Sequence, residues 1–423
     1  MLKRTLVIIS ILFFITTEMI IGKNQDFILK LDDLIVEALE NNPDLKAQHN
    51  RWKSMEKRIS QAGSLPDPVL GLNVMNLPEN SFNFNQEAMT GKQISLKQKI
   101  PFPGKLGLKQ KIAAEEARVV ELEYLEKKIQ LIKNVKKVYY GLFNIEKAIE
   151  INKKNSELLN QFEGIADTRY RTGKGLLQDV LRIQLENSRI SERIILLKQK
   201  RGSLALQLNA LLNRKSISPV GSVETPVELI QIPEFTELKS SAERNRPLIL
   251  LWQTRIKQSD KKVKFARKSY LPDFTLGVAY TQREVLTNGM GGVDYFSGSI
   301  NMTLPIYFWK KQKKLIEENY YSESSVQQKF ESVQQQVESE LKIKLTELEA
   351  NGKLLKLYKT GILQQASQTL ESALSAYQVN RVDFLTVLNS QVTLFNYEME
   401  YFRVLSNYFI NIAEIEEIIG GEI

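Results

Sequence analysis

Four short runs of the chain alternate between apolar and polar side chains. In the first run, Leu70, Leu72 and Val74 alternate with Gly71 and Asn73. A period of two residues places the apolar side chains on one face of a β-strand. The pattern predicts strands at about residues 68–78, 92–100, 273–282 and 296–304. Their opposite faces carry mostly small or hydroxylated side chains, so the predicted sheet has one apolar and one polar face.

Longer segments follow each strand pair and have a seven-residue apolar period. Leu176, Ile183, Ile190 and Leu197 recur every seven positions, and such a period predicts coiled-coil packing. We expect long helices at about residues 105–162, 176–212, 310–361 and 364–419. A helix of about 50 residues is roughly 75 Å long, which exceeds a small globular domain. With turns near residues 167–175 and 376–383, these helices predict antiparallel hairpins that project away from the sheet.

The two halves of the chain carry the same landmarks in the same order. The pairs are Pro43 with Pro247, Pro66 with Pro272, Pro101 with Pro305, and Tyr170 with Tyr377. Their offsets stay between 204 and 207 residues, far longer than a solenoid period. We therefore predict an internal two-fold repeat, with a first structural repeat at residues 23–213 and a second at residues 236–423. Residues 214–235, rich in Pro, Gly and Ser, read as the linker between them.

The first 22 residues have the layout of a secretory signal peptide. Lys3 and Arg4 precede an apolar run at residues 6–15, and small or polar residues follow up to Gly22. The apolar run is shorter than the roughly 20 residues that a membrane-spanning helix needs. We therefore expect residues 1–22 to direct export.

Composition narrows the class of function. The 423 residues include no Cys and one His, which argues against disulfides, thiolate metal sites and His-dependent catalysis. We expect no enzyme activity, no cofactor and no bound metal. The net charge of +9 is spread over helix faces, apart from clusters at residues 261–268 and 310–314. No nucleic-acid-binding motif accompanies it, so nucleic acid is not an expected partner.

The predicted sheet leaves two structures open. A soluble antiparallel sheet packed on a helix would have the same alternation. The small, hydroxylated polar face and the strand lengths instead favour a transmembrane strand pair in each half, since about 9–11 residues cross a bilayer. Four strands cannot close a spanning barrel, because open edges would leave backbone groups unsatisfied in lipid. Three copies would supply twelve strands.

The chain resembles the TolC-like outer-membrane efflux protein family over about residues 28–420. The resemblance is carried by LDDLIVEALENNPDLKAQ at residues 31–48, the SLPDP and YLPDF segments before the strands, QKIPFPGKL at residues 98–106, and the two hairpin turns that begin with Tyr. It implies a mainly α protein with a small β part. Long helical hairpins would form a periplasmic α-barrel, and each protomer would give four strands to a trimeric 12-stranded transmembrane β-barrel in the cell outer membrane.

The resemblance also implies partners and a passive role. Family members are homotrimers in outer-membrane lipid that conduct substrates received from a periplasmic adaptor (membrane fusion) protein and an inner-membrane pump. The PFPGKL stretch is most similar to the branch that serves heavy-metal pumps of the RND type. The implied function is therefore efflux of metal ions or small toxic compounds. An exit duct for type I protein secretion, and an exported structural coiled-coil protein without a pore, are the alternatives.

The residues that the resemblance singles out lie at the two hairpin turns, where family members narrow the periplasmic end and contact the adaptor. The matching positions are Tyr170, Arg171, Gly173, Gly175, Asp179, Tyr377, Arg381, Asp383, Thr386 and Asn389. Thr386 and Asn389 occupy places where many members carry an acidic ring, so Asp179 or Asp383 would have to supply an acidic gate. The alternative for both aspartates is helix N-capping.

Overall fold

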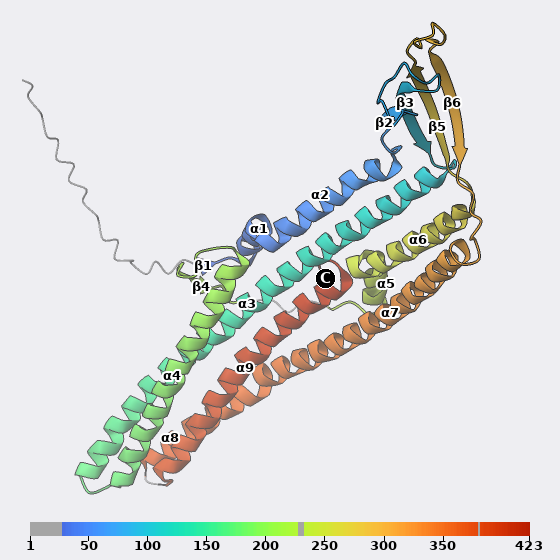
Figure 1. Ribbon diagram of the computed structural model, residues 1–423. Coiled ribbons are helices and arrows are strands. Elements are labelled where there is room, and N and C mark those ends of the chain that lie inside the picture. The colour runs from blue at the N-terminus through green and yellow to red at the C-terminus, as the bar shows by residue number, and fades with distance from the viewer. Residues whose placement is uncertain (1–27, 227–231, 380) are drawn as a thin grey trace, which may run out of the picture.

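The computed structural model describes residues 28–226, 232–379 and 381–423. The chain is strongly elongated, with a β-sheet at one end, a helical body, and two helical hairpin turns together at the far end (Figure 1). The predicted signal peptide at residues 1–22 lies outside the described residues.

Four strands form one antiparallel sheet in the order β2-β3-β5-β6. Their bounds are Val69–Met75 for β2, Gly91–Ile100 for β3, Phe274–Gln282 for β5 and Tyr295–Met302 for β6. All four predicted strands are present. The first is shorter than predicted, because Asn76 adopts a left-handed backbone (φ 51°) that ends β2. The apolar face lacks cover in the single chain: Leu72 is 75% exposed and Phe296 86%.

Long helices connect the sheet with the far end of the molecule. Their bounds are Lys105–Arg171 for α3, Leu177–Leu211 for α4, Gln312–Leu357 for α7, Leu363–Gln378 for α8 and Phe384–Ile419 for α9. At 67 residues, α3 runs beyond the predicted end at residue 162. An exposed Gly164 costs a helix only about 1 kcal/mol, and Phe162 and Ala166 on either side of it are buried.

The predicted helix break between residues 361 and 364 is wrong. Residues Tyr358–Ile362 form a π-helical turn, η2, and the Leu363 N–H donates to the Tyr358 carbonyl, five residues back. Gly361 is therefore absorbed into a continuous helix from α7 through η2 to α8. The reversal of the chain lies within the predicted turn at residues 376–383: α8 ends at Gln378, and Asp383 is the N-cap of α9.

Two shorter helix pairs pack along the half of the body nearer the sheet. They are α1 at Leu31–Asn41 with α2 at Pro43–Gly63, and α5 at Phe235–Asn245 with α6 at Pro247–Arg267, which continues into the short 3₁₀ helix η1 at Lys268–Tyr270. The second helix of each pair begins at a proline, Pro43 or Pro247, which are the first pair of repeat landmarks. Asn42 caps α2 by accepting a hydrogen bond from the Leu45 N–H at 3.1 Å.

The predicted linker takes part in the fold. Within it, β4 (Ser222–Val223) pairs in parallel with β1 (Ile28–Leu29) beside α3. The Tyr139 hydroxyl donates to the Leu29 carbonyl at 3.2 Å and accepts from the Glu224 N–H at 3.1 Å. This side chain of α3 therefore holds both segments against the middle of the body.

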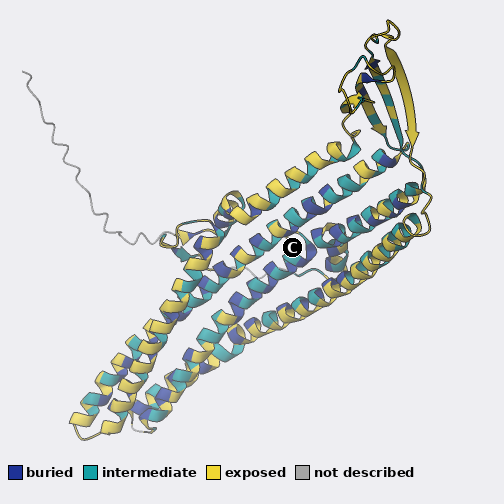
Figure 2. Cartoon of the chain, viewed as in Figure 1, coloured by how far each residue is buried: buried dark blue, intermediate teal, exposed yellow. Residues whose placement is uncertain are grey.

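The hydrophobic core follows the length of the helical body. Helix α3 packs against α2 and α6 toward the sheet and against α4 and α9 toward the turns. Buried residues concentrate on α3 and α9, whereas the sheet is mostly exposed (Figure 2). In the described part of the chain, no helix has an apolar stretch long enough to cross a membrane.

Candidate functional site at the hairpin tips

Two tight turns lie side by side at the end of the molecule farthest from the sheet (Figure 1). The first joins α3 to α4, and Gly173 in it has a φ of 72°, a conformation that glycine adopts without steric cost. Gly175 approaches the end of α3 so closely that an added Cβ would lie 3.0 Å from the Arg169 Cβ. The predicted glycines therefore occupy positions where larger side chains would alter the turn.

An apolar cluster beneath the turns joins the two hairpins. Side chains from α3, α4, α8 and α9 contribute to it, and Ile183 and Val387 are fully buried. The Phe384 ring at the start of α9 contacts the rings of Phe162 and Tyr377 edge-on, at 6.2 and 5.6 Å between centroids. Tyr377 is thus a core residue of the tip, whereas its counterpart Tyr170 is exposed.

Arg169 links the two turns directly. Its Nη1 donates to the Tyr377 carbonyl at 3.0 Å, and its guanidinium lies 4.4 Å from the centre of the Tyr377 ring. Burial raises the pKa of the Tyr377 hydroxyl above its usual range. The sequence reasoning missed Arg169. It follows Phe162 and Ala166 at helical spacing, so its place on the inner face of α3 was readable from the heptad phase.

The two predicted aspartates have different environments. Asp383 is the N-cap of α9: its Oδ1 accepts from the Thr386 hydroxyl at 2.6 Å and from the Thr386 N–H at 2.9 Å. These bonds hold the pKa of Asp383 below its usual range, the hydroxyl bond contributing most. Asp179 lies in the first turn of α4, but the N-cap there is Leu176. The capping interpretation is therefore confirmed for Asp383 and wrong for Asp179.

The remaining predicted charges point outward. Arg171 is exposed and pairs with Asp167 one turn earlier on α3, at 2.8 Å. Arg381 is exposed, and its backbone N–H donates to the Ala376 carbonyl at 2.9 Å, which closes the second turn. The structure thus brings Tyr377, Asp383 and Thr386 together in one hairpin, but it leaves Arg171 and Arg381 at the surface.

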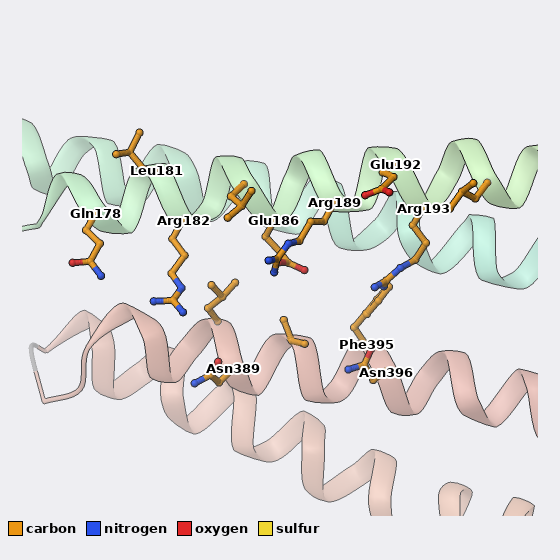
Figure 3. Close-up of a pocket in the computed structure, with 14 residues that line it drawn as sticks. Gln178, Leu181, Arg182, Glu186, Arg189, Glu192, Arg193, Asn389, Phe395 and Asn396 are labelled. Carbon is orange, nitrogen blue, oxygen red and sulfur yellow. The ribbon is translucent and has the colours of Figure 1, made fainter.

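A groove of about 950 Å³ runs between α4 and α9, behind the turns. Asn389, one of the predicted positions, lines it from α9 (Figure 3). The α4 side is highly charged, with the arginines 182, 189 and 193 and the glutamates 186 and 192. Arg193 lies 5.2 Å from the centre of the Phe395 ring across the groove. Sequence reasoning missed these arginines, whose signal is their spacing along one face of α4.

The described residues contain no group of three or more His, Cys, Asp or Glu side chains that could hold a metal ion. The tip offers hydrogen bonds, charges and an apolar cluster. This chemistry suits contact and closure.

Comparison with known proteins identifies the family. The family model for outer membrane efflux proteins matches residues 34–214 and 238–421, so it covers each half of the chain. Toxin and drug export protein A of Aggregatibacter actinomycetemcomitans is 26% identical over 225 residues. That match covers 49% of this chain and 47% of the relative, so the chain spans about half of the relative's length.

Solved structures share the fold. The outer membrane protein VceC of Vibrio cholerae superposes with a TM-score of 0.78 over 93% of this chain and 96% of that chain, at 18% identity. The CmeC outer membrane channel of Campylobacter jejuni gives a TM-score of 0.78 at 16% identity, over 92% of this chain and 85% of that chain. The expectations of an outer-membrane location and of a transport protein instead of an enzyme are confirmed by the family match. The chain belongs to the outer membrane efflux protein family.

Proposed function

We propose that three copies of this chain form a passive conduit through the outer membrane. The conduit receives metal ions or small toxic compounds from a periplasmic adaptor and an inner-membrane pump of the RND type. The observation that carries this proposal is the four-stranded sheet, which exposes an apolar face and has two open edges. A signal peptide at residues 1–22 would deliver the chain, and two structural repeats, 23–213 and 236–423 around the linker 214–235, would build each protomer.

The open edges explain why three copies are needed. Strands β2 and β6 lie at the two edges of the sheet, and an unpaired edge cannot face lipid, because its backbone N–H and C=O groups would stay unsatisfied. If β6 of one copy pairs with β2 of the next, three copies close a ring of twelve strands. An even number of that size leaves room for a lumen.

The internal repeat predicts the register of that pairing. Within one chain Ser95 of β3 lies opposite Ala279 of β5. Adding the offset of 204 residues to Ser95 gives Ser299 of β6, and subtracting 206 from Ala279 gives Asn73 of β2. The derived pair is therefore Ser299 of one copy with Asn73 of the neighbouring copy. Both belong to the polar faces of their strands, as one shared lumen would require.

Engineered cysteines test this pairing cleanly, because the chain has no Cys. Opposite residues of antiparallel strands have Cα atoms about 4.5–5.5 Å apart, which is within disulfide reach. Asn73→Cys with Ser299→Cys should give a covalent three-chain species when cells are oxidised. Asn73→Cys with Gly298→Cys is the matched control, because a shift of one residue turns the side chain to the other face. A monomer band alone, or equal cross-linking in the control, would contradict the shared barrel.

We propose that the tip closes the periplasmic end and contacts the adaptor. Support comes from the apolar cluster that joins the hairpins and from the Arg169–Tyr377 link. The proposed residues are Tyr170, Arg171, Gly173, Gly175, Asp179, Tyr377, Arg381, Asp383, Thr386 and Asn389, together with Arg169. Thr386 and Asn389 are not acidic, so an acidic ring of the common kind would be absent here and strong cation selectivity is not expected.

A second candidate is the exit duct of a type I protein secretion system. The name of the partial relative, toxin and drug export protein A, favours it. Deleting the adjacent pump gene separates the two: loss of metal or drug tolerance supports efflux, whereas loss of a secreted protein from the medium supports the exit duct.

A further inference from the structure

The connection between β6 and α7 carries charges and rings that conduction does not require. We call residues 307–314 the aromatic–lysine segment: Tyr307, Phe308 and Trp309, then lysines at 310, 311, 313 and 314. It lies at the border between the sheet and the helical body (Figure 1). In the first repeat the chain passes from Ile100 to Lys105 with Phe102 as its one aromatic residue, so the segment belongs to the second repeat alone.

The three aromatic rings are exposed and contact one another. Tyr307, Phe308 and Trp309 are 64%, 47% and 50% exposed. The Trp309 ring lies 5.2 Å from that of Phe308, which in turn lies 6.2 Å from that of Tyr270. The N–H groups of Lys310 and Lys311 both donate to the Tyr307 carbonyl at 3.1 Å, so a tight turn presents the rings. Aromatic rings at the border of an apolar sheet face mark a membrane–water interface.

Glu317 is the carboxylate that acts on the lysines of this segment, through Lys314 and more weakly through Lys313. Lys310, Lys311 and Lys313 are exposed, and no ion pair to a described residue is found for them, whereas Lys314 pairs with Glu317 at 2.6 Å. Asp273, the carboxylate that lines the hollow beside this segment, is already held by Lys105 at 2.7 Å and by Lys99 at 3.8 Å. The segment therefore has a net positive charge at the surface, which favours binding of an anionic partner.

A hollow beside the segment is lined by both apolar and positively charged side chains. It measures about 670 Å³ and lies between the end of the sheet and the helices α3 and α6. Leu304, Ile306 and Tyr307 give it an apolar side, and Lys109 and Lys311 add positive charge. A phosphate headgroup with the first carbons of an acyl chain has this combination of charge and apolar surface.

We propose that the aromatic–lysine segment binds anionic phospholipid headgroups, of the phosphatidylglycerol class, in the periplasmic leaflet of the outer membrane. This inference rests on the proposed function, because it requires the strands to span the bilayer. The segment lies on the helical side of the sheet, so it faces the periplasmic leaflet and not the outer one. Basic residues next to a membrane gather anionic lipids around them.

Trp309 is a built-in reporter for this binding. The chain has 3 Trp, and Trp52→Phe with Trp252→Phe leaves Trp309 as the single emitter. The purified oligomer is placed in phosphatidylcholine vesicles that contain a small fraction of brominated phosphatidylglycerol or brominated phosphatidylcholine. At low salt we expect the quenching to show about fivefold more phosphatidylglycerol than phosphatidylcholine next to Trp309. This factor corresponds to the attraction of a single Lys for an anionic surface, about 1 kcal/mol. Salt should reduce it.

Charge variants distinguish binding from simple insertion. Lys310→Gln with Lys311→Gln and Lys313→Gln should bring the two lipids to parity. The matched control, Lys198→Gln with Lys200→Gln and Lys356→Gln, removes the same charge from exposed positions of the helical body and should keep the enrichment. Equal quenching by the two lipids in the parent protein would overturn the lipid site. Enrichment of the anionic lipid that survives in the segment variant would overturn it too. Neither result would affect the proposal of a conduit. If neither brominated lipid quenches Trp309, the strands do not place the segment in a bilayer, and both proposals fail.

Discussion

Arg169 is the side chain on which we expect closure of the tip to depend most. Arg169→Ala removes a charge-assisted hydrogen bond and a ring contact between the two hairpins, together worth about 2–4 kcal/mol. The hairpins should separate more easily, so single-channel recordings should show more frequent or larger openings. Arg171→Ala removes the same charge from the same turn, but its partner Asp167 lies on its own helix. Equal opening of the two variants would show that the Arg169–Tyr377 contact does not control closure of the tip.

Asp383 allows capping and charge to be separated. Asp383→Asn retains a side-chain oxygen for the Thr386 N–H, whereas Asp383→Ala leaves the first turn of α9 uncapped. We expect Asp383→Ala to have the lower melting temperature of the two. Because the pKa of Asp383 is lowered in the fold, the charge stabilises the protein above the ordinary carboxyl range, and this contribution is lost as pH falls through the lowered pKa. Thermal unfolding followed over acidic pH should show that loss in the parent and not in Asp383→Asn.

At the residue scale the sequence predicted local chemistry better than contacts between hairpins. The cap at Asp383 and the left-handed glycine at position 173 follow from short-range rules. The Arg169–Tyr377 link joins residues 208 positions apart. It depends on how two coiled coils rotate against each other, which a single hairpin's sequence does not specify.

At the element scale, the two helix pairs differ in how the N-terminus of the second helix is stabilised. Asn42 caps α2, but the equivalent Arg246 caps nothing and is buried, with its Nη2 3.8 Å from the Glu126 carboxylate. Glu126 in turn accepts from the Leu248 N–H at 3.1 Å near the start of α6. A charge pair between α3 and the α5–α6 joint therefore replaces the local cap.

Removing either partner of this pair should be costly. Among the described residues, Glu126→Ala leaves Arg246, whose side chain is 7% exposed, with Glu340 at 3.8 Å as its remaining ion-pair partner. Loss of one partner of a buried pair costs about 3–5 kcal/mol. Arg246→Ala should cost a similar amount. Denaturant unfolding measures both, and Glu340→Ala, at the exposed edge of the pair, is the milder control. Changes below about 1 kcal/mol would show that the pair behaves as a surface contact.

The same pair gives a pH dependence of defined sign. Burial raises the pKa of Glu126 despite the nearby Arg246, so the folded chain takes up a proton more readily than the unfolded chain. This contribution makes the fold more stable as pH falls from the raised pKa toward the ordinary glutamate value. Glu126→Gln should remove this part of the profile.

The strands and most helix starts could be predicted, because alternation, prolines and caps are local signals. The π-helical turn could not. Gly361 looked like a helix end, but the five-residue hydrogen bond at Leu363 carries the helix past it. The packing of η2 against α9, with Tyr358 buried, outweighs the weak helix propensity of one glycine.

At the scale of the whole molecule, the sequence predicted the order of elements along the chain more reliably than the way the sheet edges are arranged. The offset landmarks agree with a family match that covers both halves separately. The parallel β1–β4 pair in the middle of the body could not be anticipated, because two-residue strands leave no periodic pattern. The open edges were expected from the number of strands, but their assignment to β2 and β6 required the strand order.

Single-channel conductance of the purified protein in planar lipid bilayers tests whether three chains share a passive pore. We expect discrete conductance steps without any energy source, and larger or more frequent openings for Arg169→Ala. A purified trimer that inserts but never conducts, alone or with its adaptor, would rule out the pore and favour an exported structural coiled-coil protein.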